Sequence, residues 1–344
     1  MLAPPWIPIP PPGYGGIEFV LALLCDALVA RGHDVELFCA PGSRSAATVR
    51  PVLDRPHPES IERALFEADH VARAFAAIEA AAKPFDLVHD HSGYTALAMA
   101  DRVAVPLAHT VHGPFDENTS PYYAQHARKG SLVCISHAQA NMAPDGADIA
   151  AVVYNPIDVE SWPLARSKEE WLLWVGRFVP EKGPQRAIAV AKEAGRPLVL
   201  AGTVQPRFER FFAKEIEPHI DGTTVRFVGE VGGARKQRLF AEAFAFLMPI
   251  RWPEPFGMVM VEALAAGTPV LAFAQGAAPE IVEHGVNGFL VKDEHEMAAF
   301  VDRAGQLDPA ACRASAQRFS PASVAAGYEA VYQAVAAASA SARA

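Results

Sequence analysis

The sequence of 344 residues has few cysteines, no long apolar run and no concentrated basic segment. The cysteines stand apart without a CxxC pair, which disfavours a disulfide framework, a zinc ribbon and a thiol redox motif. No apolar run reaches the roughly 18 residues that cross a bilayer. The start of the chain lacks the basic segment and cleavage site of a secretory signal. We therefore expect a cytoplasmic protein that keeps Cys25, Cys39, Cys134 and Cys312 as small core residues.

The balance of charge is acidic, with a formal net charge of −9. Because binding to a phosphate backbone needs a concentrated basic face, we expect no nucleic-acid partner. The same balance disfavours docking on anionic lipid. The predicted helix over 59–82 is itself net acidic, so we expect no strong membrane binding. The sequence leaves the oligomeric state open.

Short apolar runs typical of buried strands alternate with segments of helical periodicity through two α/β halves. This pattern predicts parallel sheets covered by helices on both faces, as in doubly wound, Rossmann-like domains. The expected strands are 35–40, 86–91, 106–112 and 132–136 in the first half, and 171–176, 197–202, 225–229, 244–249 and 269–274 in the second. Helices are expected over 17–32 and 59–82.

Pro, Asn, Asp and Ser gather in 155–163, which marks a linker. An Ala-rich helix follows Pro321, with Val324, Tyr328, Val331 and Tyr332 on one stripe. We therefore predict a first domain of residues 1–158 that includes the final helix 321–344, and a second domain of residues 159–320. Only a few apolar residues precede Pro4, so the first strand is expected to be nearly absent.

Glu262 is the single ionisable residue between Pro255 and Pro279. A carboxylate in apolar surroundings is costly unless something pairs with it. One interpretation is a core helix whose Glu reaches water. The other is that Glu262 accepts hydrogen bonds from the hydroxyls of a ligand, and the neighbouring motifs favour this second interpretation.

Glu254 stands just before the same predicted helix, which is expected to begin near Phe256 and Gly257. The first amides of that helix, over 256–259, are then free to face a ligand beside Glu254. The helix rise between the two carboxylates is about 8–12 Å. That separation suits opposite ends of one ligand better than an acid/base pair acting on one bond.

Arg177 and Lys182 follow the predicted strand 171–176, with Gly183 opening the next helix. Two cations at the carboxyl end of a strand can clamp a diphosphate, although a solvated charge pair with Glu181 explains them as well. Gly13-Tyr14-Gly15-Gly16 leads directly into a helix, where glycines let the backbone approach an anion. Taken alone, this motif fits a plain loop equally well.

His112 ends a predicted strand of the first half, in the sequence His109-Thr110-Val111-His112-Gly113. In open α/β sheets ligands lie at such strand ends, so His112 is a candidate contact for a sugar, although a structural role is common for such a residue. His89 and His91 share a strand face and raise the hypothesis of a metal site. Third and fourth ligands are not evident, so we expect no metal and no other cofactor.

The motifs that support a family assignment are spread over the whole chain. They are PPGYGGIE (11–18), DLVHDHS (86–92), HTVHG (109–113), CIS (134–136), YNPID (154–158), GRFVPEKG (176–183), LAG (200–202), FVGEV (227–231), EPFGMVMVEALAAGTPV (254–270) and PEIVEHGVNGFLV (279–291). With them the chain resembles family 4 of the retaining glycosyltransferases, which have two Rossmann-like domains facing a central cleft, the architecture called GT-B. The resemblance implies a metal-independent enzyme that moves a sugar from a nucleotide diphosphate sugar, UDP-linked by default, to a hydroxyl-bearing acceptor.

The resemblance also implies roles for individual residues. The catalytic set would be His112, Arg177, Lys182 and Glu254, and the donor-binding set would be Gly15, Gly16, Arg177, Lys182, Gly229, Glu254, Phe256, Gly257, Met258, Val259 and Glu262. Within these sets Arg177 and Lys182 would hold the diphosphate, Glu262 the ribose and Glu254 the transferred sugar. His112 would touch the sugar near the reacting carbon. Tyr328 and its neighbours would pack the final helix on the first domain.

Two features leave alternatives open. The usual Gly-Gly of the late loop is replaced by Gly276-Ala277-Ala278, so backbone donation to the sugar there is in doubt. The same architecture also hosts nucleotide-sugar 2-epimerases and would suit a non-catalytic nucleotide-sugar binding protein. A nicotinamide dehydrogenase is disfavoured, because the first glycine motif lacks the GxGxxG spacing.

Overall fold

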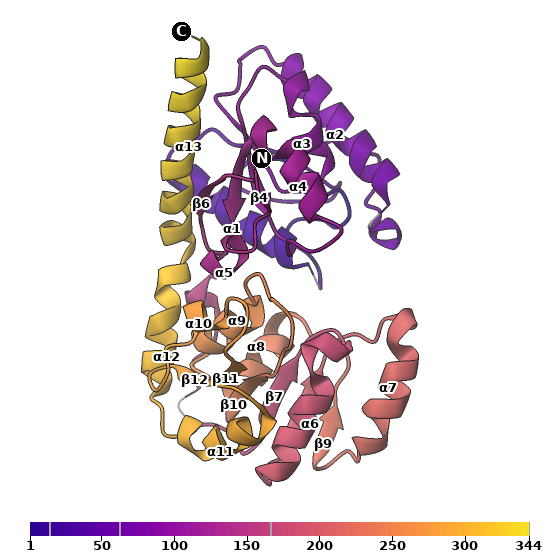
Figure 1. The fold of residues 1–344 in the computed structure, drawn as a ribbon, viewed down its shortest axis with the longest axis vertical. Helices are drawn as coiled ribbons and strands as arrows, with labels where there is room; N and C mark the ends of the chain where they lie inside the picture. The colour runs from indigo at the N-terminus through magenta and orange to yellow at the C-terminus, as the bar shows by residue number, and fades with distance from the viewer. Residues whose placement is uncertain (14, 62, 166, 344) are drawn as a thin grey trace. The chain divides into compact units, whose positions relative to one another are not determined.

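The computed structural model describes residues 1–343 except Tyr14, Glu62 and Arg166, with side chains described up to Ala338 (Figure 1). Its contacts divide the chain into two compact units. Unit 1 comprises Met1–Pro156 and the segment from Pro321 onward, and unit 2 comprises Ile157–Ser320. Among the described residues, no helix combines the length and the apolar character that a membrane crossing requires.

Unit 1 is built on parallel strands. They are β1 (Glu36–Cys39), β2 (Thr48–Pro51), β3 (Val88–Asp90), β4 (Leu107–Val111), β5 (Ser131–Cys134) and β6 (Ile149–Val152). Leu2 bridges Phe38 of β1 and Asp90 of β3 and so joins β2-β1 to β3-β4-β5-β6. The expected first strand is thus reduced to a short paired segment, in which the Leu2 amide donates to the His89 carbonyl at 2.8 Å.

The unit 1 helices are α1 (Gly16–Ala30), α2 (Ala64–Glu79), α3 (Thr95–Ala98), α4 (Ser120–His126), α5 (His137–Ala140) and α13 (Pro321–Arg343). The prediction that a helix starts at 59 was wrong. Pro58–Ser60 forms a 3-10 turn, and Ile61 then takes an extended backbone (φ −50°, ψ 137°) that a helix cannot include.

The final helix α13 belongs to unit 1, as the resemblance implied. Val324, Tyr328 and Val331 are buried in one cluster with Leu24 and Leu28 of α1. Burial of each such apolar side chain contributes about 1.5–3 kcal/mol. The yellow helix therefore runs beside the indigo α1 in Figure 1.

Unit 2 contains a six-stranded parallel sheet of order β12-β11-β10-β7-β8-β9. The strands are β7 (Leu172–Val175), β8 (Leu198–Ala201), β9 (Val225–Phe227), β10 (Ala245–Met248), β11 (Val270–Phe273) and β12 (Gly288–Val291). The helices are α6 (Pro184–Glu193), α7 (Glu209–Glu215), α8 (Gly233–Glu242), α9 (Met258–Ala265), α10 (Ala278–Ile281), α11 (Glu294–Ala304) and α12 (Pro309–Ala316). Trp174, Leu200 and Phe273 lie in the core of this unit.

The order of strands in unit 2 reverses between β7 and β10. From β7 the chain proceeds outward through β8 and β9, and from β10 it proceeds the other way through β11 and β12. In an open α/β sheet, such a switch point leaves a crevice beyond the carboxyl ends of the two strands. This edge positions the candidate site.

Candidate functional site

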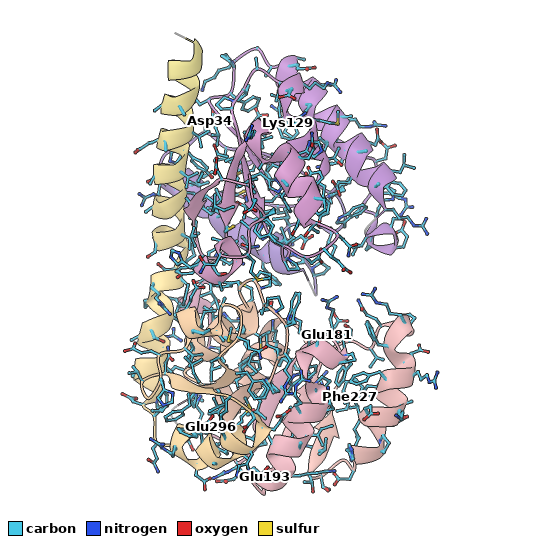
Figure 2. The ribbon with its side chains drawn as sticks, in the orientation of Figure 1. Asp34, Lys129, Glu181, Glu193, Phe227 and Glu296 are labelled. Carbon is cyan, nitrogen blue, oxygen red and sulfur yellow. The ribbon has the colours of Figure 1, made fainter. Side chains whose placement is uncertain are left out.

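Arg177 and Lys182 line a pocket of about 240 Å³ in the loop that follows β7. Arg207, Trp252 and Glu181 also line it (Glu181 is labelled in Figure 2). Three cations therefore surround one small pocket at the switch point, which suits an anion with several oxygens. The sequence analysis identified two of them and missed Arg207, which comes from the segment after β8.

Tight packing holds this loop in place. Gly183 adopts a left-handed backbone (φ 76°), and a Cβ there would lie 2.3 Å from the Pro249 carbonyl oxygen. The Trp174 indole Nε1 donates to the Lys182 carbonyl at 3.1 Å. Because both contacts come from unit 2 itself, the loop is held by its own domain.

Lys182 and Glu254 form an ion pair across the switch point. Trp252 supports it from one side: its Nε1 donates to Glu254 Oε2 at 2.8 Å, and the Lys182 ammonium lies 4.7 Å from the centroid of its ring. The ammonium is thus not paired with Glu181, the alternative that the sequence left open. Two residues predicted for different parts of a donor meet directly.

The helix that follows Glu254 begins at Met258, with Gly257 as the preceding residue in a left-handed conformation (φ 88°). The first-turn amides of Met258 and Val259 have no acceptor within the helix, and both residues are half-buried. Phe256 differs from them, because its side chain is buried and packs edge-on against Phe319. Any contact of Phe256 with a ligand would therefore come from its backbone.

Glu262 lies in the second turn of α9 and is 9% exposed. Its Oε1 accepts a 2.6 Å hydrogen bond from the Lys236 ammonium of α8. Its Oε2 is buried without a hydrogen-bond partner among the described residues. The carboxylate therefore keeps one oxygen for a further donor. The sequence analysis missed Lys236, because the sequence of a charged helix does not show which acidic residue each cation pairs with.

Gly229 follows β9, where its carbonyl accepts from the Gly202 amide at 2.9 Å. Gly202 itself packs so closely on Gly176 that a Cβ would lie 1.8 Å from the Gly176 oxygen. The ends of β7, β8 and β9 thus make close backbone contacts at Gly176, Gly202 and Gly229, which together form a glycine rim.

The late loop also meets Glu254. The Ala277 amide donates to the Glu254 carbonyl at 3.0 Å, and a Cβ on Gly276 would lie 2.6 Å from Glu254 backbone atoms. In this structure the Ala277 amide is therefore engaged within the protein, and the loop supports Glu254.

In unit 1, Gly15 and Gly16 begin α1, while Tyr14 lies outside the described residues. A Cβ on Gly15 would lie 2.7 Å from Pro11, whereas Gly16 faces open space. Glu18 is buried in the first turn, and the removal of its carboxyl from water raises its pKa to about 7.

His112 follows β4 and is half-buried. Its Nε2 lies 2.8 Å from Nδ1 of His91. Desolvation, together with the nearby His109, lowers the pKa of His112 to about 3. The ring is therefore a neutral imidazole at ordinary pH.

His89 and His91 share one face as predicted, with ring centroids 4.1 Å apart. Among the described residues, no three metal-ligating side chains are grouped as a metal site would need.

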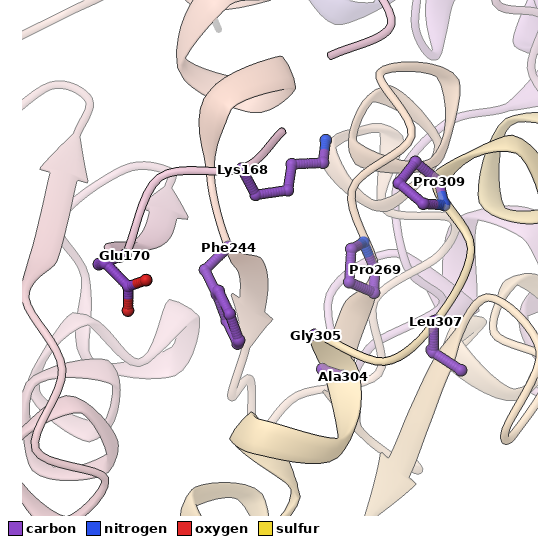
Figure 3. Close-up of a pocket in the computed structure, with 8 residues that line it drawn as sticks. All are labelled: Lys168, Glu170, Phe244, Pro269, Ala304, Gly305, Leu307 and Pro309. Carbon is purple, nitrogen blue, oxygen red and sulfur yellow. The ribbon is translucent and has the colours of Figure 1, made fainter. Parts of the chain in front are cut away.

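A second pocket, of about 250 Å³, lies at the opposite end of the unit 2 sheet (Figure 3). Glu170, Phe244 and Pro269 line it, and they precede β7, β10 and β11. The Lys168 ammonium donates to the Ala241 carbonyl at 2.6 Å and to Thr268 Oγ1 at 2.8 Å. The lysine of this pocket is therefore held by the protein, and the strands present their amino ends here, away from the carboxyl ends where ligands lie in open α/β sheets.

Comparison with known proteins agrees with this geometry. The family described as Glycosyl transferases group 1 matches residues 158–308, and Glycosyltransferase Family 4 matches residues 14–161. D-inositol 3-phosphate glycosyltransferase of Mycolicibacterium smegmatis is 29% identical, covering 90% of this chain and 84% of that protein. Glycogen synthase of Mycobacterium tuberculosis is 28% identical, covering 90% and 88%.

Among solved structures, AviGT4, a glycosyltransferase involved in avilamycin A biosynthesis, superposes with a TM-score of 0.72. It is 28% identical, and the match covers 98% of this chain and 97% of that chain. The fold is therefore GT-B, with two Rossmann-like domains. The chain belongs to the family 4 glycosyltransferases.

Proposed function

We propose that the chain is a retaining, metal-independent glycosyltransferase that moves a hexosyl group from a nucleotide diphosphate sugar, UDP-linked by default, to a hydroxyl of an acceptor. The observation that carries the proposal is the set of groups at the β7/β10 switch point. Arg177, Lys182 and Arg207 surround one pocket there, and Glu254 is paired with Lys182.

Unit 2 would hold the donor. Arg177 and Lys182 would bind the diphosphate together with the free amides of Met258 and Val259, since cations and helix-start amides both favour negative charge. Glu262 would accept from the ribose hydroxyls through its unpartnered oxygen, and the glycine rim at Gly229 would border the base.

The chemistry asks for stabilisation of the leaving group. The bond between the sugar carbon and the phosphate oxygen breaks, with its electron pair passing to the diphosphate. The acceptor hydroxyl attacks the same face, and its proton passes to the leaving phosphate oxygen. Lys182 and Arg177 would stabilise the developing negative charge, which is the role a metal fills elsewhere. Glu254 would hold the sugar hydroxyls, and His112 of unit 1 would contact the sugar near the reacting carbon.

The proposed acceptor is a hydroxyl-bearing molecule. The names of the relatives refer to D-inositol 3-phosphate, glycogen and avilamycin A biosynthesis. Because these names differ, membership of the family supports a nucleotide-sugar donor but does not identify the acceptor.

A thermal-shift screen of the full chain against UDP, GDP, ADP, dTDP and their sugars tests the donor. The expected result is stabilisation by one nucleoside diphosphate with EDTA present. Transfer to a hydroxyl acceptor with the anomeric configuration kept, read by proton NMR, would then confirm retention. Conversion of the nucleotide sugar without an acceptor would favour an epimerase. Binding of a donor without either reaction would favour a binding protein.

A further inference from the structure

Unit 1 contains a continuous chain of hydrogen-bonding side chains that runs from the final helix to His112. The Tyr332 hydroxyl lies 2.7 Å from His89 Nδ1. His91 Nε2 lies 3.4 Å from that same nitrogen, and His91 Nδ1 lies 2.8 Å from His112 Nε2. Tyr332 of α13 is linked in this way to the ends of β3 and β4.

A second branch fixes the other side of His89. Its Nε2 lies 2.8 Å from Thr110 Oγ1, which lies 3.0 Å from the Tyr328 hydroxyl. Thr110 and Tyr328 are both buried. Every nitrogen of His89 therefore has a partner inside the protein.

The chain is made of neutral rings. His89 and His91 are 1% and 2% exposed, and desolvation holds the pKa of each well below its ordinary value. A neutral imidazole carries one N–H donor and one nitrogen lone pair. Each ring can then donate through one nitrogen only, so the state of one ring determines the state of the next.

The distances are satisfied by one consistent direction of donation that starts at the phenol. In it the Tyr332 O–H donates to Nδ1 of His89, and the proton of His89 stands on Nε2. That N–H donates to Thr110. In that direction His91 turns its Nε2–H toward Nδ1 of His89 as a second and longer donor to the lone pair that accepts from Tyr332, and it keeps its own lone pair on Nδ1. His112 must then donate its own Nε2–H to His91.

We propose that Tyr332 and His91 are positioning residues that hold His112 in the Nε2–H tautomer, so that its Nδ1 lone pair is the acceptor for a sugar hydroxyl. Among the described residues, Nδ1 of His112 has no hydrogen-bond partner, which leaves it for a ligand. The sugar as ligand rests on the proposed function; the tautomer rests on unit 1 alone.

A metal site does not explain this cluster. At 2.8 Å, His91 Nδ1 and His112 Nε2 share a hydrogen and cannot both point a lone pair at one ion. The neighbouring His109 belongs to a separate pair, because its Nδ1 donates to Asp90 at 2.6 Å. Ser92 satisfies the other Asp90 oxygen through its amide at 2.8 Å and its hydroxyl.

The test is the protonation site of the His112 nitrogens, read by ¹⁵N–¹H correlation NMR on the histidine-labelled full chain. The wild-type spectrum is expected to show a proton on Nε2. His91→Leu removes the acceptor, and both tautomers of His112 should then appear. His91→Asn should restore the single tautomer, since its amide oxygen can accept from His112. Tyr332→Phe should weaken the preference. Glu329→Gln is the matched control on α13: it breaks the pair with Arg31 and should leave the tautomer unchanged.

Activity supplies the second readout, with the donor found by the screen above. His91→Leu should lower kcat about tenfold, the effect of one hydrogen bond, with KM for the donor within about twofold, and His91→Asn should recover most of it. An Nδ1–H tautomer in the wild type, or an unchanged tautomer in His91→Leu, overturns the proposal. If His91→Leu does not fold, Tyr332→Phe and His91→Asn decide it. Failure of sugar transfer would leave the NMR result standing and would count against the proposed function only.

Discussion

Lys236 of α8 donates a 2.6 Å hydrogen bond to Glu262 of α9, in the middle of an otherwise apolar helix. Their side chains are 23% and 12% exposed. A carboxylate so buried is strongly destabilising when its counter-charge is removed. The pair therefore explains how unit 2 keeps an acid poised beside the proposed donor site.

Removing one partner of this pair should cost more than removing both. Lys236→Met is expected to lower the free energy of unfolding by about 3 kcal/mol, because it leaves Glu262 buried and unpaired. The double variant Lys236→Met, Glu262→Met should recover most of that loss, since an apolar pair of similar volume fits the site. Urea unfolding of the two single variants and the double variant measures the coupling. Additive effects would show that the ion pair is not the source of the stability.

Glu262 and Glu254 should separate binding from transfer. Glu262→Ala is expected to weaken binding of the nucleoside diphosphate about tenfold, because a hydroxyl–carboxylate contact is worth about 1.5–3 kcal/mol. Glu254→Ala should chiefly lower the rate of transfer, since Glu254 is assigned to the sugar. Calorimetry with the nucleotide and a transfer assay with its sugar measure the two effects. Negligible effects of both changes on both quantities would refute the assignment.

Much of unit 2 could be predicted from the sequence because its central strands are buried on both faces and read as apolar runs. The edge strands β2 and β6 were not predicted, since most of their residues are exposed or half-exposed and show no such run. β12 begins with Gly288, where a Cβ would lie 2.1 Å from the Val270 carbonyl oxygen. From the sequence alone, Gly288 indicates a turn and not the first residue of a strand. The structure shows that a glycine is needed there because β11 approaches too closely for a side chain.

Part of the candidate site could also be predicted, where a residue contrasts with its neighbours in the sequence. Glu262 stands out because its surroundings are apolar, whereas Lys236 stands beside Arg235 and Arg238 and cannot be told from a solvated cation. The spacing of His89 and His91 predicts a shared face. Their bond to Tyr332 depends on how α13 packs on unit 1, which no local pattern encodes.

The three cations of the pocket should bind the diphosphate rather than the nucleoside. Lys182→Gln and Arg207→Gln are each expected to weaken binding of a nucleoside diphosphate several-fold and to leave binding of the nucleoside nearly unchanged. Arg207 is exposed, so its contribution should fade as salt screens it. Arg210→Gln is a matched control, because Arg210 is an exposed cation of α7 outside the pocket lining. Equal losses for nucleoside and diphosphate would contradict the proposed phosphate pocket.

Glu18 should make the stability of unit 1 depend on pH. Desolvation raises the pKa of this carboxyl from 4.5 to about 7 in the folded chain, so the folded state binds its proton more tightly than the unfolded state. Stability from this group is therefore complete below about pH 4.5 and is lost as the pH rises through 7, by roughly 3 kcal/mol in all. Glu18→Gln carries no such proton and should remove this loss.

The comparison is made by chemical unfolding of wild type and Glu18→Gln at pH 5.5 and 8.5. The variant should gain stability relative to wild type at the higher pH. A constant difference at both values would show that Glu18 ionises in the folded chain as it does in the unfolded one.

The same carboxyl lies beside Gly15, whose Cβ would be 3.0 Å from Glu18 Oε2. An ionised Glu18 would repel an anion bound at the start of α1. Nucleoside diphosphate binding should therefore weaken above pH 7 more in the wild type than in Glu18→Gln. An equal pH dependence in the two proteins would contradict a role for Gly15 in the phosphate site.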